Sequence, residues 1–402
     1  MRIAFVTTSL GHGGAERHSI TVMNGLAERG HECHAVYLKN DASQLDRIRV
    51  QGKESVFCAD ANGYLDRSAL KRFTAHLEQL QPDAIVAANT YALMYAALAR
   101  RLTKLKVPLV VTFHSTNLPE FKDQIKMLID RFFILSADCL VFVCDNQRRY
   151  WQRRGMFARR TEVIHNGINT QHFSAEEFSG EAEHLRQQFG FSASDFVVGM
   201  LAVLRPEKNH LQMLDAIVRL RQQGISAKAM LIGDGIMRTA LEARAGDLGI
   251  AQHVIITGAC QEVRPYITAC NVLALCSTGH ETFSLAALEA MAMGKPVVHA
   301  DIGGANEMIE QWHNGALFPV GDTEALVQQL ALLSARGSAE ALGCNARRVV
   351  QTRFSENVML DRYEQLLLDL CQKKDPQRAR EPINEMSWRP LTNKPNARSE
   401  SL

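Results

Sequence analysis

The chain opens with MRIAFVTTSLGHGGAERH (residues 1–18), an apolar run followed by a glycine-rich loop and then by the start of a helical pattern. A strand buried on both faces of a parallel sheet reads as an almost unbroken apolar run, as residues 3–7 do. The glycines stand where the chain must turn from that strand into the helical pattern of residues 16–29. This stretch predicts a strand-loop-helix unit, the building block of doubly wound α/β domains.

The same alternation runs through the chain in two series. The first predicts strands at residues 3–7, 34–38, 84–88, 109–113, 139–143 and 161–164, with helices between them such as 16–29 and 67–79. After a polar stretch, the second predicts strands at residues 196–201, 228–232, 253–257, 272–276 and 296–299. Strands that alternate with helices predict parallel sheets, and 402 residues exceed the usual size of one hydrophobic core. We therefore expect two Rossmann-like α/β domains.

The two series divide the chain into an N-terminal domain over residues 1–170 and a C-terminal domain over residues 171–355. A helical pattern that ends near Cys371 predicts a last helix over residues 356–372. Residues 373–402 are rich in proline, asparagine and charge and have almost no apolar periodicity. We expect this tail to be largely disordered.

Composition and cysteine usage indicate a protein inside the cell. Apolar residues make up 46% and charged residues 22%, as in soluble globular proteins. The nine cysteines are scattered, without a C-x-x-C pair or a Cys/His cluster at zinc spacing, so we expect reduced thiols. The first residues lack the pattern of a signal peptide, and no apolar run reaches the roughly 18–20 residues that span a bilayer. We expect a cytoplasmic location.

The glycine loop GHGGAERH (residues 11–18) is a candidate anion site, because backbone N–H groups and a helix N-terminus would face any ligand there. It does not match the dinucleotide fingerprint, since Glu16 stands where the third glycine is required. It also lacks the G-K-[ST] ending of a P-loop. A tight turn without a ligand remains the alternative.

A stronger signal is HETFSLAALEAMAMGKPVV (residues 280–298), in which Glu281 precedes a predicted helix and Glu289 lies within it. Eight residues make about two helical turns, so both carboxylates can point to one face. Ser284 and Leu285 fall at the helix N-terminus, where unpaired N–H groups and the dipole suit a diphosphate. The alternative is a buried helix with two incidental acids, although a buried helix seldom keeps an unpaired glutamate.

A third element, LRPEKNH (residues 204–210), follows the strand predicted at 196–201. Arg205 and Lys208 would lie at the carboxyl edge of the sheet, where ligands of open α/β sheets bind. Cations there would neutralise a leaving diphosphate without a metal, so we expect neither a metal nor another cofactor. As isolated residues they could equally be solvated surface charges.

Together with TFHS (112–115), HNGIN (165–169), GDG (233–235) and GGANE (303–307), these motifs resemble the retaining GT-B glycosyltransferases of family four, the glycosyl transferases group 1, over roughly residues 1–370. The resemblance implies a GT-B fold, in which two Rossmann-like domains face each other across a cleft and a C-terminal helix crosses back to the N-terminal domain. It implies transfer of a sugar, with retention, from a UDP- or GDP-sugar to a glycan or lipid-linked acceptor in bacterial polysaccharide or glycolipid synthesis.

The resemblance also implies roles for individual residues. Glu281 would hold the hydroxyls of the donor sugar, His114 would lie near that sugar, and Arg205 and Lys208 would take the charge of the diphosphate. Glu289 would bind the ribose. The remaining positions would surround the donor: the amides of Ser284 and Leu285 at a phosphate, Gly13 and Gly14 close to the donor and the acceptor pocket, and Gly233, Asp234 and Gly235 beside the nucleoside.

Three positions depart from the family pattern. Val203 stands where many members have an arginine, which makes the role of Arg205 less certain than that of Lys208. Thr282 follows Glu281 where glycine is common, and Asn89 replaces a frequent histidine. A nucleotide-sugar epimerase or hydrolase on the same fold, or a non-catalytic sugar-nucleotide-binding protein, remains an alternative function.

The stretch Arg148–Arg160 is basic and contains Tyr150, Trp151 and Phe157. Such a segment can dock on anionic lipid headgroups and bring a lipid-linked acceptor to the cleft, which would make the protein peripheral on the inner face of the membrane. A solvated, partly packed helix is an equal alternative. The basic runs lack a zinc or RNP motif, so we expect no nucleic-acid partner.

Overall fold

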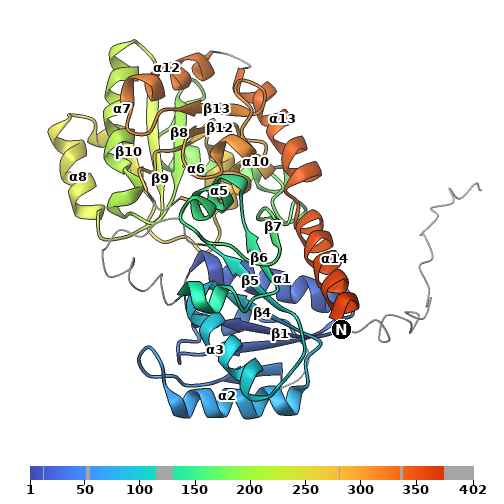
Figure 1. Ribbon diagram of the computed structural model, residues 1–402. Coiled ribbons are helices and arrows are strands. Elements are labelled where there is room, and N and C mark those ends of the chain that lie inside the picture. The colour runs from blue at the N-terminus through green and yellow to red at the C-terminus, as the bar shows by residue number, and fades with distance from the viewer. Residues whose placement is uncertain (12, 51–54, 115–129, 280, 336–337, 375–402) are drawn as a thin grey trace, which may run out of the picture.

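The computed structural model describes residues 1–374 except for residues 12, 51–54, 115–129, 280 and 336–337. It contains two α/β domains, which lie one above the other in Figure 1. Each is built around one parallel sheet with helices on its faces. The fold class expected from the sequence is confirmed.

The N-terminal domain holds a seven-stranded parallel sheet of order β3-β2-β1-β4-β5-β6-β7. Its strands are β1 (Arg2–Thr7), β2 (Glu32–Tyr37), β3 (Val56–Cys58), β4 (Ala84–Ala88), β5 (Leu109–Phe113), β6 (Cys139–Phe142) and β7 (Thr161–Val163). Its described helices are α1 (Gly14–Glu28), α2 (Arg67–Leu80), α3 (Asn89–Leu102) and α5 (Asp145–Arg153), with the 3₁₀ turn η1 (Leu45–Arg47). The strand order reverses between β1 and β4, which places a crevice at their carboxyl ends.

The C-terminal domain holds a six-stranded parallel sheet of order β10-β9-β8-β11-β12-β13. Its strands are β8 (Phe196–Leu201), β9 (Ala227–Ile232), β10 (Val254–Ile256), β11 (Val272–Leu275), β12 (Val297–Ala300) and β13 (Gly315–Phe318). Its described helices are α6 (Ser179–Gln188), α7 (His210–Gln222), α8 (Arg238–Asp247), α9 (Arg264–Ala269), α10 (Leu285–Ala292), α11 (Ala305–Met308), α12 (Thr323–Ser334) and α13 (Ser338–Arg353), with the 3₁₀ turns η3 (Glu176–Phe178), η4 (Pro206–Lys208) and η5 (Ala251–His253).

Every strand expected from the sequence is present, but two strands were missed. These are β3, with the three residues VFC, and β13, with the sequence GALF. Each lies at one edge of its sheet and pairs with a single neighbour. A run this short, and in β13 one that begins with glycine, carries too little apolar signal to predict a strand.

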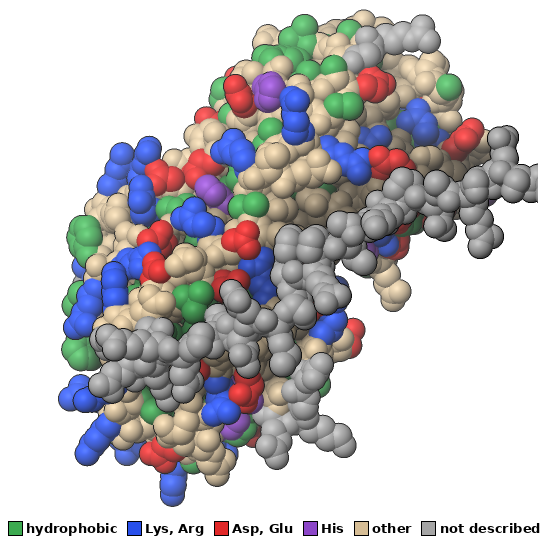
Figure 2. Space-filling model, turned by 90° about the vertical axis from the view of Figure 1, so that its right-hand side faces the viewer, with side chains coloured by type: hydrophobic (Ala, Val, Ile, Leu, Met, Phe, Trp, Pro, Cys, Tyr) green, Lys and Arg blue, Asp and Glu red, His purple; other side chains and the backbone are tan. Residues whose placement is uncertain are grey.

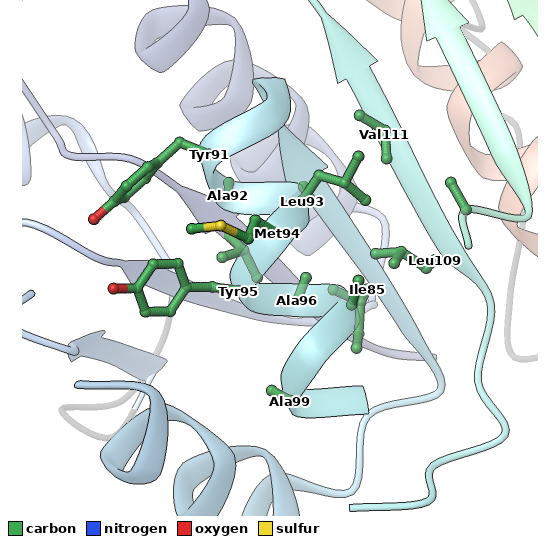
Figure 3. Packing of buried hydrophobic residues seen from close by; sticks show 14 of the residues in the cluster. Ile85, Tyr91, Ala92, Leu93, Met94, Tyr95, Ala96, Ala99, Leu109 and Val111 are labelled. Atoms are coloured by element: carbon green, nitrogen blue, oxygen red, sulfur yellow. The ribbon is translucent and has the colours of Figure 1, made fainter. Parts of the chain in front are cut away.

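Helix α3 shows how the core of the N-terminal domain is packed (Figure 3). Leu93 and Tyr95 are fully buried, as is Ile85 of β4. In Figure 3 Leu93 points toward the strand that carries Leu109 and Val111, whereas the ring of Tyr95 points to the other side of the helix. The Tyr95 hydroxyl accepts a hydrogen bond of 2.8 Å from the amide of Asp66, the residue that caps α2. The buried aromatic thus satisfies its polar atom and fixes the neighbouring helix.

Helix α14 (Glu356–Lys374) returns from the C-terminal domain to the N-terminal one, as expected (Figure 1). Tyr363 and Leu367 are fully buried against apolar residues of β1 and α1. The helix continues to Lys374, two residues beyond the predicted end. Residues 373 and 374, which were expected in the disordered tail, are therefore helical, and the remaining residues of that expectation, 375–402, lie outside the described residues. The division of the domains at residue 170 stays a prediction.

Three further observations concern the cysteines, the helices and the surface charges. All nine cysteines lie in described residues, and none forms a disulfide. Among the described helices, none combines the length and the hydropathy that crossing a membrane requires. Basic and acidic side chains are interspersed over most of the face shown in Figure 2.

Candidate active site

A cavity of about 810 Å³ lies between the two domains. The N-terminal domain contributes residues of α1 and of the segment around η1. The C-terminal domain contributes residues 201–203 after β8, residues 259–263 after β10, Gly233 and Asp234 after β9, and part of α10. The strands of the C-terminal sheet thus present their carboxyl ends to the cavity, the position where α/β sheets bind ligands.

Lys208 and Glu281 form an ion pair at the carboxyl edge of this sheet. The Nζ atom lies 2.6 Å from Oε2, and the side chains are 25% and 12% exposed. Ser277 donates a further hydrogen bond of 3.0 Å to the same oxygen. Burial raises the pKa of Glu281, but the charges of Lys208 and His299 and the two hydrogen bonds outweigh it, so the net pKa lies below its usual value. Glu281 is therefore ionised at neutral pH.

Glu289 is the second acid of the motif, and it is paired with a residue of the other domain. Its Oε1 atom lies 2.8 Å from Nη2 of Arg17, and its side chain is only 6% exposed. Burial raises the pKa of Glu289 above its usual value, and the charge and hydrogen bond of Arg17 offset only part of this effect. The sequence indicates no role for Arg17, although this residue stands within the glycine motif of residues 11–18.

The N-terminus of α10 lies between these two acids. Ser284 caps the helix through a 3.3 Å hydrogen bond from the amide of Ala287 to its hydroxyl. No described acceptor takes the N–H groups of Ser284 or Leu285. These donors and the positive end of the dipole can receive an anion, and the phosphate contact expected for Ser284 and Leu285 stays a prediction.

The glycine motif at residues 303–307 supports this segment. Gly303 has a φ of 61°, and a Cβ atom there would collide with the carbonyl oxygen of Glu281. The amide of Gly304 donates a 2.7 Å hydrogen bond to the carbonyl of Thr282. Only glycine allows the chain to pass this close to the loop that carries Glu281.

His114 lies at the end of β5 and faces the Glu281 loop from the N-terminal domain. The hydroxyl of Thr282 donates a 3.1 Å hydrogen bond to the carbonyl of His114. The amide of His114 donates one of 3.0 Å to the side chain of Asn89. Thus Asn89 and Thr282, two of the three departures from the family pattern, both contact His114. Its Nε2 atom is buried and has no partner among the described residues.

His114 packs against a second buried histidine. The rings of His114 and His18 meet edge to face with centroids 4.7 Å apart, and His18 in turn hydrogen-bonds the hydroxyl of Tyr363 on α14 at 3.0 Å. Burial and the neighbouring His18 lower the pKa of His114 well below its usual value, and burial lowers that of His18 to about 4. Both imidazoles are neutral at pH 7, so the free nitrogen of His114 can hydrogen-bond a hydroxyl group.

The glycine loop of the first motif brings α1 to the cleft. Gly13 caps α1, and a Cβ atom on Gly13 would collide with the carboxylate of Glu16. Gly14 begins the helix and has open space around it. The predicted contact of these glycines with the donor stays a prediction, but the loop does direct Arg17 into the cavity.

Gly233 and Asp234 of the Gly233-Asp234-Gly235 loop line the cavity, whereas the predicted place of this loop beside a nucleoside stays a prediction. The two glycines have φ values of 147° and 156°. Asp234 accepts a hydrogen bond of 2.8 Å from the amide of Gly235 and pairs with Arg238 at 3.3 Å. The loop is thus held by its own hydrogen bonds in a conformation that favours glycine.

We expect the substitution Gly233→Ala to lower the free energy of unfolding by about 2–3 kcal/mol, because the added Cβ would meet the carbonyl oxygen of Ala202 at a positive φ. The matched control is Gly246→Ala in α8, where a Cβ has open space, and it should stabilise by about 0.5–1 kcal/mol. Urea unfolding of both variants measures the difference. Equal free energies of unfolding for the two variants would show that the loop rearranges to accommodate the added Cβ atom.

Arg205 is not brought together with the other predicted residues. It caps η4, its side chain is exposed, and no ion pair or hydrogen bond of that side chain is present in the described residues. Lys208 pairs with Glu281, and Thr282, the neighbour of Glu281, contacts the carbonyl of His114. The cavity between the domains is lined by Glu289, Leu285, Gly233 and Asp234. The role of Arg205 at the diphosphate stays a prediction.

Glu307 is a further residue whose role the sequence did not indicate. Its carboxylate accepts hydrogen bonds of 2.9 Å from the amides of Asp145 and Asn146, at the start of α5, and from Nε2 of His165. It therefore caps a helix of the N-terminal domain from the C-terminal one. In the sequence, the only feature that singles out Glu307 is its place in the GGANE motif.

The structure buries one aromatic residue of the basic stretch Arg148–Arg160, and contact of this stretch with a lipid surface stays a prediction. Trp151 is 1% exposed and belongs to the core, so it cannot reach a lipid surface. Arg148 and Arg149 are both paired with Asp145. Phe157, at 59% exposure, is the aromatic side chain of the stretch that remains open.

The described residues contain no group of three or more His, Cys, Asp or Glu side chains that could hold a metal ion. The protein has two Rossmann-like domains, a cleft at the edges of their sheets, and two largely buried acids beside a helix N-terminus. These features define a glycosyltransferase of the GT-B class. The chain belongs to the glycosyl transferases group 1 family, whose model matches residues 181–349, and the Glycosyltransferase Family 4 model matches residues 12–172.

Several known proteins are similar to this chain. EpsD of Bacillus subtilis is 28% identical over 232 residues, which span 57% of this chain and 60% of EpsD. The lipopolysaccharide core biosynthesis glycosyltransferase LpsE of Rhizobium meliloti is 26% identical over 362 residues, or 88% of this chain and 96% of LpsE. The crystal structure of Anabaena HepE in complex with UDP is 25% identical and has a TM-score of 0.80 over 92% of this chain and 100% of HepE. HepE has also been solved with UDP-glucose.

Proposed function

We propose that this protein transfers a sugar, with retention of anomeric configuration, from a UDP- or GDP-sugar to a glycan or lipid-linked acceptor in bacterial polysaccharide or glycolipid synthesis. The observation that carries the proposal is the arrangement around α10. Glu281 and Glu289 are both largely buried, each is paired with a cation, and the unpaired N–H groups of Ser284 and Leu285 lie between them. One segment can thus hold a sugar, a diphosphate and a ribose.

The donor is the better supported of the two substrates. The cavity beside Glu289 has a volume in the range of small-molecule sites, and Gly233 and Asp234 line it. The binding of UDP and UDP-glucose by HepE, which shares the fold, supports a nucleotide sugar. In this arrangement Glu289 accepts hydrogen bonds from the ribose hydroxyls.

The reaction is a substitution at the anomeric carbon. The bond from that carbon to the diphosphate oxygen breaks, the acceptor oxygen bonds to the same face, and the acceptor proton passes to the leaving diphosphate. Lys208 and the α10 N-terminus stabilise the charge that grows on the diphosphate. Glu281 and the free Nε2 atom of His114 hold the sugar hydroxyls, so that the reacting atoms stay aligned.

The positive charge needed at the diphosphate comes from side chains in this proposal, so no metal or other cofactor takes part. We also propose a cytoplasmic protein that associates with the inner face of the membrane to meet a lipid-linked acceptor. The nine free thiols support a reducing compartment. The exposed Phe157 and the exposed Arg159 support contact with anionic lipids.

The test is thermal unfolding of the purified full chain with UDP, GDP and ADP, each with and without EDTA. One nucleotide at about 100 times its dissociation constant should stabilise the protein by about 2.7 kcal/mol, and EDTA should leave this effect unchanged. With the donor base known, the anomeric proton coupling of the product reports retention. Failure of all three nucleotides to stabilise the chain would overturn the proposal.

A further inference from the structure

Arg17 connects the two domains at the cavity. It lies in the first turn of α1, whereas its partner Glu289 lies in α10, 272 residues along the chain. The Arg17 side chain is 41% exposed and the Glu289 side chain 6%. A guanidinium that stays open to the cleft thus reaches a carboxylate that is almost completely buried.

The partner of this guanidinium, Glu289, lies about one turn from the start of α10. Leu285 and Glu289 are four residues apart, so they share one face of the helix at a separation of about 6 Å along its axis. Arg17, Leu285 and Glu289 all line the same cavity. Within the described residues Arg17 makes one side-chain hydrogen bond, to Glu289, which leaves most of its five N–H donors available.

We propose that Arg17 is a contact for the diphosphate of the donor, supplied across the cleft by the N-terminal domain. This inference rests on the proposed function, since it requires a nucleotide whose ribose hydrogen-bonds Glu289. When the donor binds, the ribose hydroxyls replace the guanidinium of Arg17 as partners of Glu289. The guanidinium then pairs with the phosphates at the α10 N-terminus, about one helical turn from Glu289. A guanidinium can form two parallel hydrogen bonds to a phosphate, so the exchange gives Arg17 an equal or stronger partner.

This role explains why the glycine loop lies at the cleft. The amide of Arg17 donates a 3.0 Å hydrogen bond to the carbonyl of Gly13, so the loop and the first turn of α1 together orient the side chain. In this proposal the glycine motif binds the donor through the positive charge of Arg17 as well as through its backbone. Because the ligand contacts both domains, donor binding favours the closed cleft, from which water is excluded.

Calorimetric titration of the full chain distinguishes this role from a merely structural one. The ligands are the nucleoside diphosphate that stabilises the wild type and the matching nucleoside, which lacks phosphates. The variant is Arg17→Met. The matched control is Arg244→Met, which removes a charge outside the cavity from a side chain of α8 that is 44% exposed and pairs with Asp215 at 2.9 Å.

We expect Arg17→Met to weaken diphosphate binding about 10- to 100-fold and to change nucleoside binding less than about threefold, while Arg244→Met changes neither. Equal weakening of both ligands would mean that Arg17 only positions Glu289 and would overturn the proposal. Unchanged diphosphate binding would overturn it as well. If the wild type bound none of UDP, GDP and ADP, the proposed function itself would fall, and this inference with it.

Discussion

Replacing Lys208 with methionine is expected to lower the rate of sugar transfer about 10²- to 10³-fold. The Lys208 ammonium lies 2.6 Å from Glu281 at the sheet edge, and methionine keeps much of the length of the side chain without its charge. The lost charge is the one that would stabilise the leaving diphosphate in the transition state. The measurement is the turnover number for release of the nucleoside diphosphate at saturating donor.

The control for Lys208→Met must separate this charge from surface charge in general. Arg219 forms an ion pair with Glu324 in the same domain, and both side chains are largely exposed. Arg219→Met should therefore leave turnover unchanged. Because Ser277 still donates to Glu281 in the Lys208 variant, we expect that variant to unfold cooperatively. Turnover within tenfold of the wild type would contradict the role of Lys208.

The substitution Glu289→Leu is expected to stabilise the ligand-free protein and to weaken nucleotide binding at least about 100-fold. A largely buried carboxylate is costly even when paired, and leucine replaces it with apolar surface, which should add about 1–2 kcal/mol to the free energy of unfolding. The freed Arg17 side chain is 41% exposed and can be hydrated. Ribose, however, loses an acceptor whose hydrogen bonds are charge-assisted.

Urea unfolding and calorimetric nucleotide titration of the same sample test both parts of this prediction. The matched control is Glu324→Leu, which removes an exposed carboxylate from α12. It should leave nucleotide affinity unchanged. Nucleotide affinity of Glu289→Leu equal to that of the wild type would show that the ribose binds elsewhere, and a loss of stability would show that the ion pair with Arg17 outweighs the cost of burial.

The sheets could be predicted because their interior strands are largely apolar. Runs such as residues 84–88 and 109–113 match β4 and β5 residue for residue, since strands covered on both faces have no polar side to interrupt the pattern. The strands β3 and β13 escaped prediction because their runs of three and four residues carry too little apolar signal, so that pairing with β2 and β12 decides their place. That pairing depends on residues distant in the chain.

The candidate site was predictable where its residues share one local element. Glu281, Ser284 and Glu289 belong to one loop and helix, so their spacing alone predicts a common face. Asn89 and Thr282 were noticed only as separate departures, and the structure joins them at His114. Arg17 stood in a quoted motif without a role, because nothing in its neighbourhood along the chain indicates a partner 272 residues away.

The sequence by itself determined the two parallel-sheet domains, the acids and helix start of the α10 segment, and the loop that carries Lys208. These features depend on hydrophobic periodicity and on spacings of a few residues, which a linear pattern records. Only the tertiary structure decided that Arg17 reaches Glu289, that Glu307 caps α5, and that Trp151 lies in the core. Those outcomes depend on how the domains pack against each other and on which helix face is buried, and both are set by contacts between residues far apart in the chain.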